Sequence, residues 1–108
     1  MFITTWQEIL DIQNKLYPEW RSKKPRLLYS TALAGELGEL CGVITHLDGG
    51  GTNLQKYTEA MILEEAADTY IQLVLLLEKS GFDIRHFHNA IVDKLTVLRK
   101  RLKSGRRW

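Results

Sequence analysis

The chain has 108 residues, a hydrophobic content of 44% and a formal net charge of +2. A chain of this length forms one domain, residues 1–108, whose small core makes self-association a common source of further buried area. No uninterrupted apolar run approaches the roughly 18–20 residues of a membrane span, and no signal peptide is evident, so we expect no membrane partner. A lone cysteine, Cys41, excludes an intrachain disulfide, fits a reducing cytoplasm and is expected to be a core thiol.

Charge is distributed unevenly along the chain. Residues 99–108 contain six basic side chains and no acidic one, whereas residues 1–98 contain nine basic and 13 acidic side chains. A basic segment at a chain end can bind nucleic acid or an anionic surface, yet it is also the usual composition of a solvated helix end. Nucleic acid is therefore not the expected partner, and binding through this segment is kept as an alternative.

Hydrophobic periodicity predicts four helical segments. The first spans about 6–16, where Thr5 and Glu8 have the spacing of a capping box and Pro18 follows the end. A polar connector at 19–25 leads to a second helix at about 27–47. The apolar residues of this second helix recur at alternating steps of four and three: Leu33, Leu37, Leu40, Ile44 and Leu47.

Glycines mark the later helix boundaries. The run Gly49-Gly50-Gly51 ends the second helix; it lacks the Gly-Lys-Ser/Thr of a phosphate-binding loop, so we expect a plain helix connection. The third helix is predicted at about 57–79 and the fourth after Asp83, its expected N-cap. The fourth helix has the apolar seam Ile84, Phe87, Ile91, Leu95, Leu98 and Leu102. Since no segment alternates with period two, the sequence predicts an all-α protein, a four-helix-type bundle.

Two carboxylate pairs lie within the predicted helices: Glu36 with Glu39, and Glu65 with Asp68. The i,i+3 spacing places each pair on one helix face, at the border of the apolar seam. Antiparallel packing of the two helices would bring the pairs together, and converging carboxylates require a neutralising cation. Sets of oxygen ligands suit Mg²⁺ or Mn²⁺. A solvated charged face explains any single pair; two pairs favour a metal site.

Two glycines flank the first carboxylate pair. Gly35 and Gly38 each lower helix propensity by roughly 0.5–1 kcal/mol relative to alanine, and each permits a close approach of backbone or ligand. A helix that carries both beside its acids is more readily explained by a site than by amphipathicity alone.

The segment Gly35-Glu36-Leu37-Gly38-Glu39-Leu40, followed by Glu65-Ala66-Ala67-Asp68, resembles the E-x-x-E … E-x-x-D signature of the MazG-like, all-α nucleoside triphosphate pyrophosphohydrolases. The similarity extends to Trp20, Pro25 and Arg26 and to the segments 81–84 and 93–95. It implies hydrolysis of (deoxy)nucleoside triphosphates between the α and β phosphates. The role that we expect for such an activity is cleaning of the nucleotide pool. Residues 64–68 are equally similar to phosphoribosyl-ATP pyrophosphohydrolase, which leaves that substrate as an alternative.

The resemblance also implies roles for individual residues. Glu36, Glu39, Glu65 and Asp68 would hold Mg²⁺, or Mn²⁺ in its place. Glu39, or failing that Glu36, would act as general base towards the attacking water.

Contacts to the nucleotide are expected from further side chains. Lys94 and Arg101, on one edge of the fourth helix, are the first choice for phosphate contacts, followed by Arg99 and Arg26; an exposed solvated charge is the alternative for each. Trp20 would stack on a base or else lie in the core or an interface. Gln72, at a position where several relatives carry an aromatic residue, would touch the base or sugar.

The predicted helices have more apolar surface than a single short bundle can cover. Val74 and Leu63, on the third helix, are among the residues expected to stay exposed in one chain. We therefore expect a homodimer or a dimer of dimers, with a nucleotide site drawn from more than one chain. The competing class is a non-enzymatic helical adaptor dimer that binds nucleic acid through the basic C-terminal segment.

Overall fold

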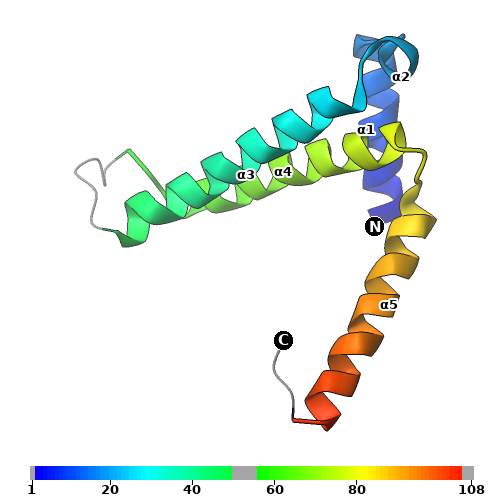
Figure 1. Ribbon diagram of the computed structural model, residues 1–108. Helices are drawn as coiled ribbons and strands as arrows, with labels where there is room; N and C mark the ends of the chain where they lie inside the picture. The colour runs from blue at the N-terminus through cyan, green and yellow to red at the C-terminus, as the bar shows by residue number, and fades with distance from the viewer. Residues whose placement is uncertain (1, 50–55, 106–108) are drawn as a thin grey trace.

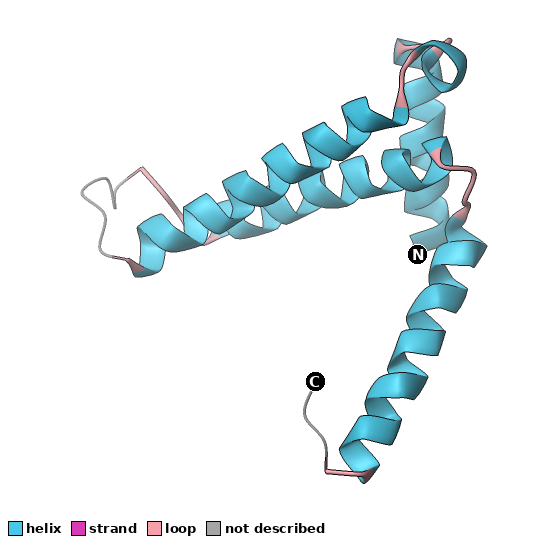
Figure 2. Cartoon of the chain, in the orientation of Figure 1, coloured by secondary structure: helices cyan, strands magenta, loops and turns pink. Residues whose placement is uncertain are grey.

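The computed structural model describes residues 2–49 and 56–105, and helix accounts for 84% of them. The helices are α1 (Phe2–Leu16), α2 (Trp20–Lys23), α3 (Arg26–Asp48), α4 (Ala60–Lys79) and α5 (Ile84–Lys103). The described residues form no strand (Figure 2). The all-α prediction is therefore confirmed, whereas the polar connector at 19–25 contains the additional short helix α2.

The long helices α3 and α4 form an antiparallel hairpin, and α1 crosses its end (Figure 1). Helix α5 leaves that end and runs away from the hairpin instead of returning along it. The radius of gyration is 17.2 Å, compared with about 13 Å for a compact chain of this length. One chain therefore does not close into a four-helix bundle.

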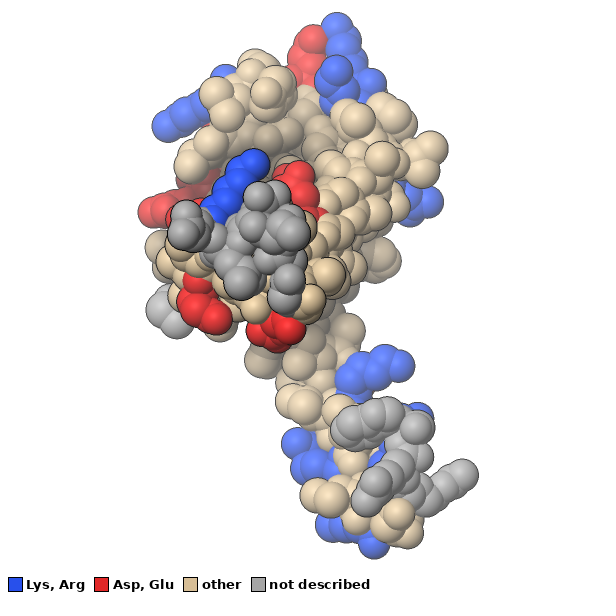
Figure 3. All heavy atoms as spheres, turned by 90° about the vertical axis from the view of Figure 1, so that its left-hand side faces the viewer, with Lys and Arg blue, Asp and Glu red and all other residues tan. Residues whose placement is uncertain are grey.

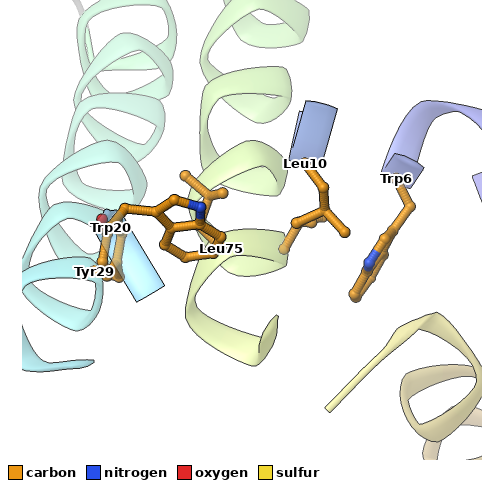
Figure 4. Packing of buried hydrophobic residues seen from close by; sticks show 6 residues of the cluster. Trp6, Leu10, Trp20, Tyr29 and Leu75 are labelled. Carbon is orange, nitrogen blue, oxygen red and sulfur yellow. The ribbon is translucent and has the colours of Figure 1, made fainter. Parts of the chain in front are cut away.

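The core lies where α1, α2 and the two ends of the hairpin meet. Trp20 and Tyr29 pack edge to face beside Leu75, while Trp6 and Leu10 approach α4 from α1 (Figure 4). The polar edges of both tryptophans are satisfied. Trp6 Nε1 donates to Glu78 Oε2 over 2.7 Å, and Trp20 Nε1 donates to Asn14 Oδ1 over 2.8 Å.

Burial corrects one prediction about α4. Leu63 is 76% exposed, as expected, but Val74 is fully buried in the cluster beneath α1. The reason is that α1 covers only the end of the hairpin, so the apolar face of α4 is buried near its C-terminus and open further along. Cys41, expected in the core, is exposed, so the described part of the chain leaves this residue of α3 uncovered.

Two helix boundaries follow from recognisable local chemistry. At the end of α4, Gly81 adopts φ +89°, and the Phe82 amide donates to the Leu77 carbonyl while the Gly81 amide donates to that of Glu78, which is a Schellman motif. At the start of α5, the Asp83 carboxylate accepts from the backbone amides of Arg85 and His86. The prediction that Asp83 caps this helix is confirmed.

The start of α1 differs from the sequence prediction. The helix begins at Phe2, so Thr5 lies inside its first turns, where the Thr5 hydroxyl donates to the Phe2 carbonyl over 3.1 Å. The predicted capping box with Glu8 is therefore wrong. A hydroxyl can bond a carbonyl within its own helix instead of capping the amides, and the spacing of residue types does not distinguish the two.

Helix α3 is long and apolar enough to cross a membrane by length and composition alone, with a mean hydropathy of 1.3 over its most apolar window. This indication is weak, because core helices and signal sequences meet the same criteria. The sequence expectation concerned uninterrupted apolar runs, whereas α3 meets the criteria of length and mean hydropathy with polar residues among the apolar ones.

Candidate metal centre

Three of the four carboxylates in the two predicted pairs meet in the middle of the hairpin. Oxygen atoms of Glu36 from α3 and of Glu65 and Asp68 from α4 all lie within 4.8 Å of one another. Antiparallel packing brings them together because Glu36 faces α4 while Glu65 faces α3, and Asp68 follows Glu65 after about one turn. The convergence predicted from the i,i+3 spacing is present for these three residues.

Glu39 lies beside this group. Its side chain is exposed, and its charge is one of the causes that raise the pKa of Glu36 and of Glu65. Glu39 is therefore placed at the solvent side of the cluster formed by Glu36, Glu65 and Asp68.

Burial and repulsion raise the pKa of two of these carboxyl groups. For both Glu36 and Glu65, desolvation is the largest cause, and the charges of Glu39 and Asp68 add to it. Within residues 2–49 and 56–105, no group donates a hydrogen bond to Glu36 Oε2 or Glu65 Oε2, although both atoms are buried. Ionised carboxylates only accept, so a proton shared with Glu39 or a bound cation would satisfy these oxygens.

The donor set fits a hard divalent cation. The ligands available are carboxylate oxygens alone, which suit Mg²⁺ or Mn²⁺ and not the soft metals that prefer thiolate or imidazole. The two buried oxygens without a partner are the observation that separates this cluster from an ordinary exposed acidic face. Glu36, Glu65 and Asp68 are the residues that would hold the ion.

The glycines beside the cluster leave its surroundings open. A Cβ added at Gly35 or Gly38 would meet nothing within 4 Å. No described residue therefore uses the close approach that these glycines permit, and both glycines are exposed.

The residues predicted to contact phosphate are not brought to the cluster within one chain. Arg26 is the first residue of α3, ten residues and about 15 Å along the helix from Glu36. Lys94, Arg99 and Arg101 are exposed on α5, which diverges from the hairpin (Figure 1). The structure of a single chain therefore assembles the acidic half of the predicted site without its basic half.

The two residues predicted to contact base or sugar have different positions. Trp20 is 1% exposed, its ring packs on Tyr29 and its Nε1 is bonded to Asn14, so it is the core tryptophan of the two alternatives and cannot stack on a ligand. Gln72 is half-buried on α4, about one turn beyond Asp68. Only Gln72 remains close to the cluster.

The sequence did not predict an apolar groove beside Tyr70 of α4. Its volume is about 670 Å³, and it lies between the start of α1, Tyr70 of α4 and the first turns of α5. The apolar residues that line it are Phe2, Ile3, Ile84, Phe87 and Ile91. The sequence did contain a sign of this groove, because Ile84, Phe87 and Ile91, which line it, are also the first residues of the apolar seam of α5.

Comparison of the chain with protein-family models, with curated proteins and with solved structures gives no match. The case for a function therefore depends on the geometry and chemistry of the site itself.

Proposed function

We propose that the protein is a Mg²⁺-dependent nucleotide pyrophosphohydrolase of the MazG-like kind, which cleaves nucleoside triphosphates between the α and β phosphates. The observation that carries this proposal is the group of three carboxylate oxygens from two helices within 4.8 Å, two of them belonging to side chains with buried, unpartnered oxygens. The signature around Glu36, Glu39, Glu65 and Asp68 supports the same reaction.

Glu36, Glu65 and Asp68 would hold the ion, which when bound would neutralise phosphate charge and activate water. Glu39 is exposed at the edge of the cluster, where it can orient a water molecule and take its proton. The water oxygen bonds to phosphorus on one side of the α–β bridge, and the bridging P–O bond breaks. The products are a nucleoside monophosphate and pyrophosphate, with the water proton held by Glu39.

The carboxylates of the cluster cannot catalyse this reaction unless the negative charge of the phosphates is neutralised. A triphosphate brought towards four carboxylates is repelled at every step of its approach, so a cation must lie between them. Basic side chains would complete the neutralisation, and Lys94 and Arg101 remain our choice for phosphate contacts.

A panel of nucleoside triphosphates, with phosphoribosyl-ATP included, tests this proposal directly. We expect equal amounts of monophosphate and pyrophosphate in the presence of Mg²⁺ and none in excess EDTA, with the products separated by ion-exchange chromatography. Release of orthophosphate instead of pyrophosphate, or no turnover of any member of the panel, would contradict it. Turnover confined to phosphoribosyl-ATP would select that alternative.

A second candidate function is a nucleic-acid-binding adaptor, favoured by the basic face of α5. In Figure 3, the lower part of the molecule, which is α5, shows Lys and Arg side chains and no acidic one on this face, whereas the upper part shows both kinds. Deleting residues 104–108 separates the two functions, since it spares Lys94 and Arg101. Hydrolysis is expected to persist in this deletion, whereas an adaptor would show no turnover and a salt-dependent DNA affinity that the deletion weakens.

A further inference from the structure

The apolar groove beside Tyr70 takes no part in the metal centre. Tyr70 follows Asp68 by two residues, which is about 200° around α4, so the groove and the acidic cluster lie on different faces of this helix. None of the residues that line the groove belongs to the cluster. The groove therefore needs an explanation of its own.

Aromatic contacts hold the walls of the groove in place. The ring centroid of Tyr70 on α4 lies 6.1 Å from that of Phe2 and 6.5 Å from that of Trp6, both on α1. The Trp6 ring also lies 6.0 Å, centroid to centroid, from Phe87 on α5. Trp6 is itself fixed, because it is buried and its Nε1 donates to Glu78. Contacts of this kind between tilted rings stabilise one arrangement of the three helices, so the groove is formed before any ligand binds.

The groove has the size of a ligand site and exposes apolar surface to water. Its volume of about 670 Å³ lies within the range of roughly 300–1,000 Å³ that is typical of pockets for small molecules. Phe2 is 64% exposed, Ile3 is 70% exposed and Ile91 is 42% exposed. Apolar surface that is concave and bordered by polar residues is characteristic of a binding site, whereas apolar residues scattered singly on a surface are not.

The charged and amide side chains of the groove come from one edge of α5. His88 and Asn89 follow Arg85 by three and four residues, so the three side chains form a single ridge. Ile84 and Ile91, which also line the groove, lie beside this ridge on the apolar seam of α5. An elongated ligand can therefore place an apolar body against the seam and a polar group at the ridge.

The charge of the lining identifies the polar group of this ligand. The described residues that line the groove include Arg85 and His88 but no aspartate or glutamate. Arg85 makes an exposed ion pair with Asp83 over 3.3 Å, which leaves other N–H groups of its guanidinium free to donate. The side chains of His88 and Asn89 have no hydrogen-bond partner among the described residues. The ridge can thus neutralise one anionic group, whereas a triphosphate requires more positive charge than Arg85 provides.

We propose that the apolar groove binds a long-chain carboxylate, a free fatty acid. The alkyl chain lies against the apolar walls that α1, α4 and α5 contribute, and the carboxylate accepts hydrogen bonds from the ridge of Arg85, His88 and Asn89. From Ile84 to Ile91 the groove follows α5 for seven residues, about 10 Å, which suits an extended chain better than a single ring.

Isothermal titration calorimetry of the full chain tests the proposal, in EDTA so that the metal centre stays empty. We expect one decanoate to bind per chain. From hexanoate to decanoate, the dissociation constant should fall by up to about four-fold for each added methylene, because each one leaves water. Decan-1-ol, which lacks the charge, should bind roughly ten-fold more weakly than decanoate, and decylammonium should not bind.

A substitution in the apolar wall tests the place of the chain. Ile3→Asp puts a carboxylate into the groove, and an acidic residue in the first turn of α1 is compatible with the helix. The dissociation constant for decanoate should rise at least about ten-fold. Thr4→Asp is the matched control, because it adds the same charge at the next residue, which is exposed and does not line the groove. It should bind decanoate as the wild type does.

A substitution in the ridge tests the place of the carboxylate. Arg85→Gln should weaken decanoate about ten-fold and leave the affinity for decan-1-ol unchanged. A purely structural role of Arg85 would change both affinities alike. Lys103→Gln, which removes a positive charge from the same helix beyond the groove, is the matched control and should change neither. Circular dichroism checks that each variant keeps its helical content.

Three results would overturn the proposal. The first is the absence of saturable decanoate binding to the wild-type chain, and the second is an equal affinity for decanoate and decylammonium. The third is wild-type affinity in folded Ile3→Asp. If decanoate does not bind and Ile3→Asp changes the sedimenting mass, the groove is a contact between copies of the chain instead. Neither Mg²⁺ nor nucleotide turnover enters these measurements, so the proposed function stands or fails separately.

Discussion

Magnesium binding at the acidic cluster is the prediction that the geometry constrains most closely. The change is Asp68→Asn, which removes one of the three carboxylates whose oxygens lie within 4.8 Å and keeps the size of the side chain. We expect the loss of this ligand to weaken Mg²⁺ affinity by about 100-fold, the upper end of what loss of an outer-shell partner costs. Without metal, the variant should melt at the wild-type temperature or above it, because repulsion within the cluster is relieved.

The size of the effect follows from linkage between binding and folding. At a Mg²⁺ concentration about 100 times its dissociation constant, the wild-type chain gains about 2.7 kcal/mol. The variant is then near its own dissociation constant and gains only about 0.4 kcal/mol. At about 4–8 °C per kcal/mol for a domain of this size, the rise in melting temperature falls from about 10–20 °C to about 2–3 °C.

Thermal melts followed by circular dichroism, in EDTA and in Mg²⁺, measure these shifts at one fixed protein concentration. Glu64→Gln is the matched control, because Glu64 is an exposed acid next to Glu65 that does not belong to the cluster. It should retain the full wild-type shift. An equal Mg²⁺ response in Asp68→Asn and wild type, or an equal loss in the control, would refute the assignment of the site.

Four further predictions concern the acidic cluster and other parts of the chain. Glu39→Gln should abolish Mg²⁺-dependent pyrophosphate release while leaving the melting temperature unchanged or raised; activity retained in this variant would remove Glu39 as general base. The pKa values of Glu36 and Glu65 are raised above the ordinary 4.5, so the folded chain binds more protons than the unfolded chain. The free energy of unfolding in EDTA should therefore fall as the pH rises from about 4.5. Bound Mg²⁺ should cancel this fall at neutral pH. The pKa of Asp83 is lowered by its hydrogen bonds to the first backbone amides of α5. Its contribution to the free energy of unfolding should therefore be fully present above pH 3.8, the ordinary pKa, and be lost as the pH falls below the pKa in the folded chain. Asp83→Ala should remove this contribution at every higher pH. Leu75→Ala should lower the free energy of unfolding by about 2–5 kcal/mol in urea titrations, because Leu75 is 4% exposed in the core; a change below about 0.5 kcal/mol would show that the end of the hairpin is not packed as described.

Local chemistry was the part of the fold that could be predicted from sequence. The i,i+3 spacing of the acids placed Glu36, Glu65 and Asp68 on facing helix sides, and the structure brings their oxygens together. Asp83 was identified as an N-cap for the same kind of reason. Both depend on residues a few positions apart in one helix, where the geometry of the backbone fixes the relation between side chains.

Burial was predicted less well, because it depends on which helix covers which face. Val74 and Cys41 lie on apolar stretches of similar appearance, yet Val74 is buried under α1 and Cys41 is exposed. Trp20 could be assigned to a ligand or to the core on sequence grounds. Its contacts with Asn14 and Tyr29 decide for the core.

By itself, the sequence determined that the chain is helical, where most helices end, and which carboxylates share a face. Each of these follows from periodicity and capping, which act over one or two helical turns. Only the tertiary structure decided that the carboxylates meet across α3 and α4 and that α5 departs from the hairpin instead of closing the bundle. The direction of α5 is set by the turn through Gly81 and by what the core at the end of the hairpin can cover, and neither is encoded in the periodicity of α5 itself.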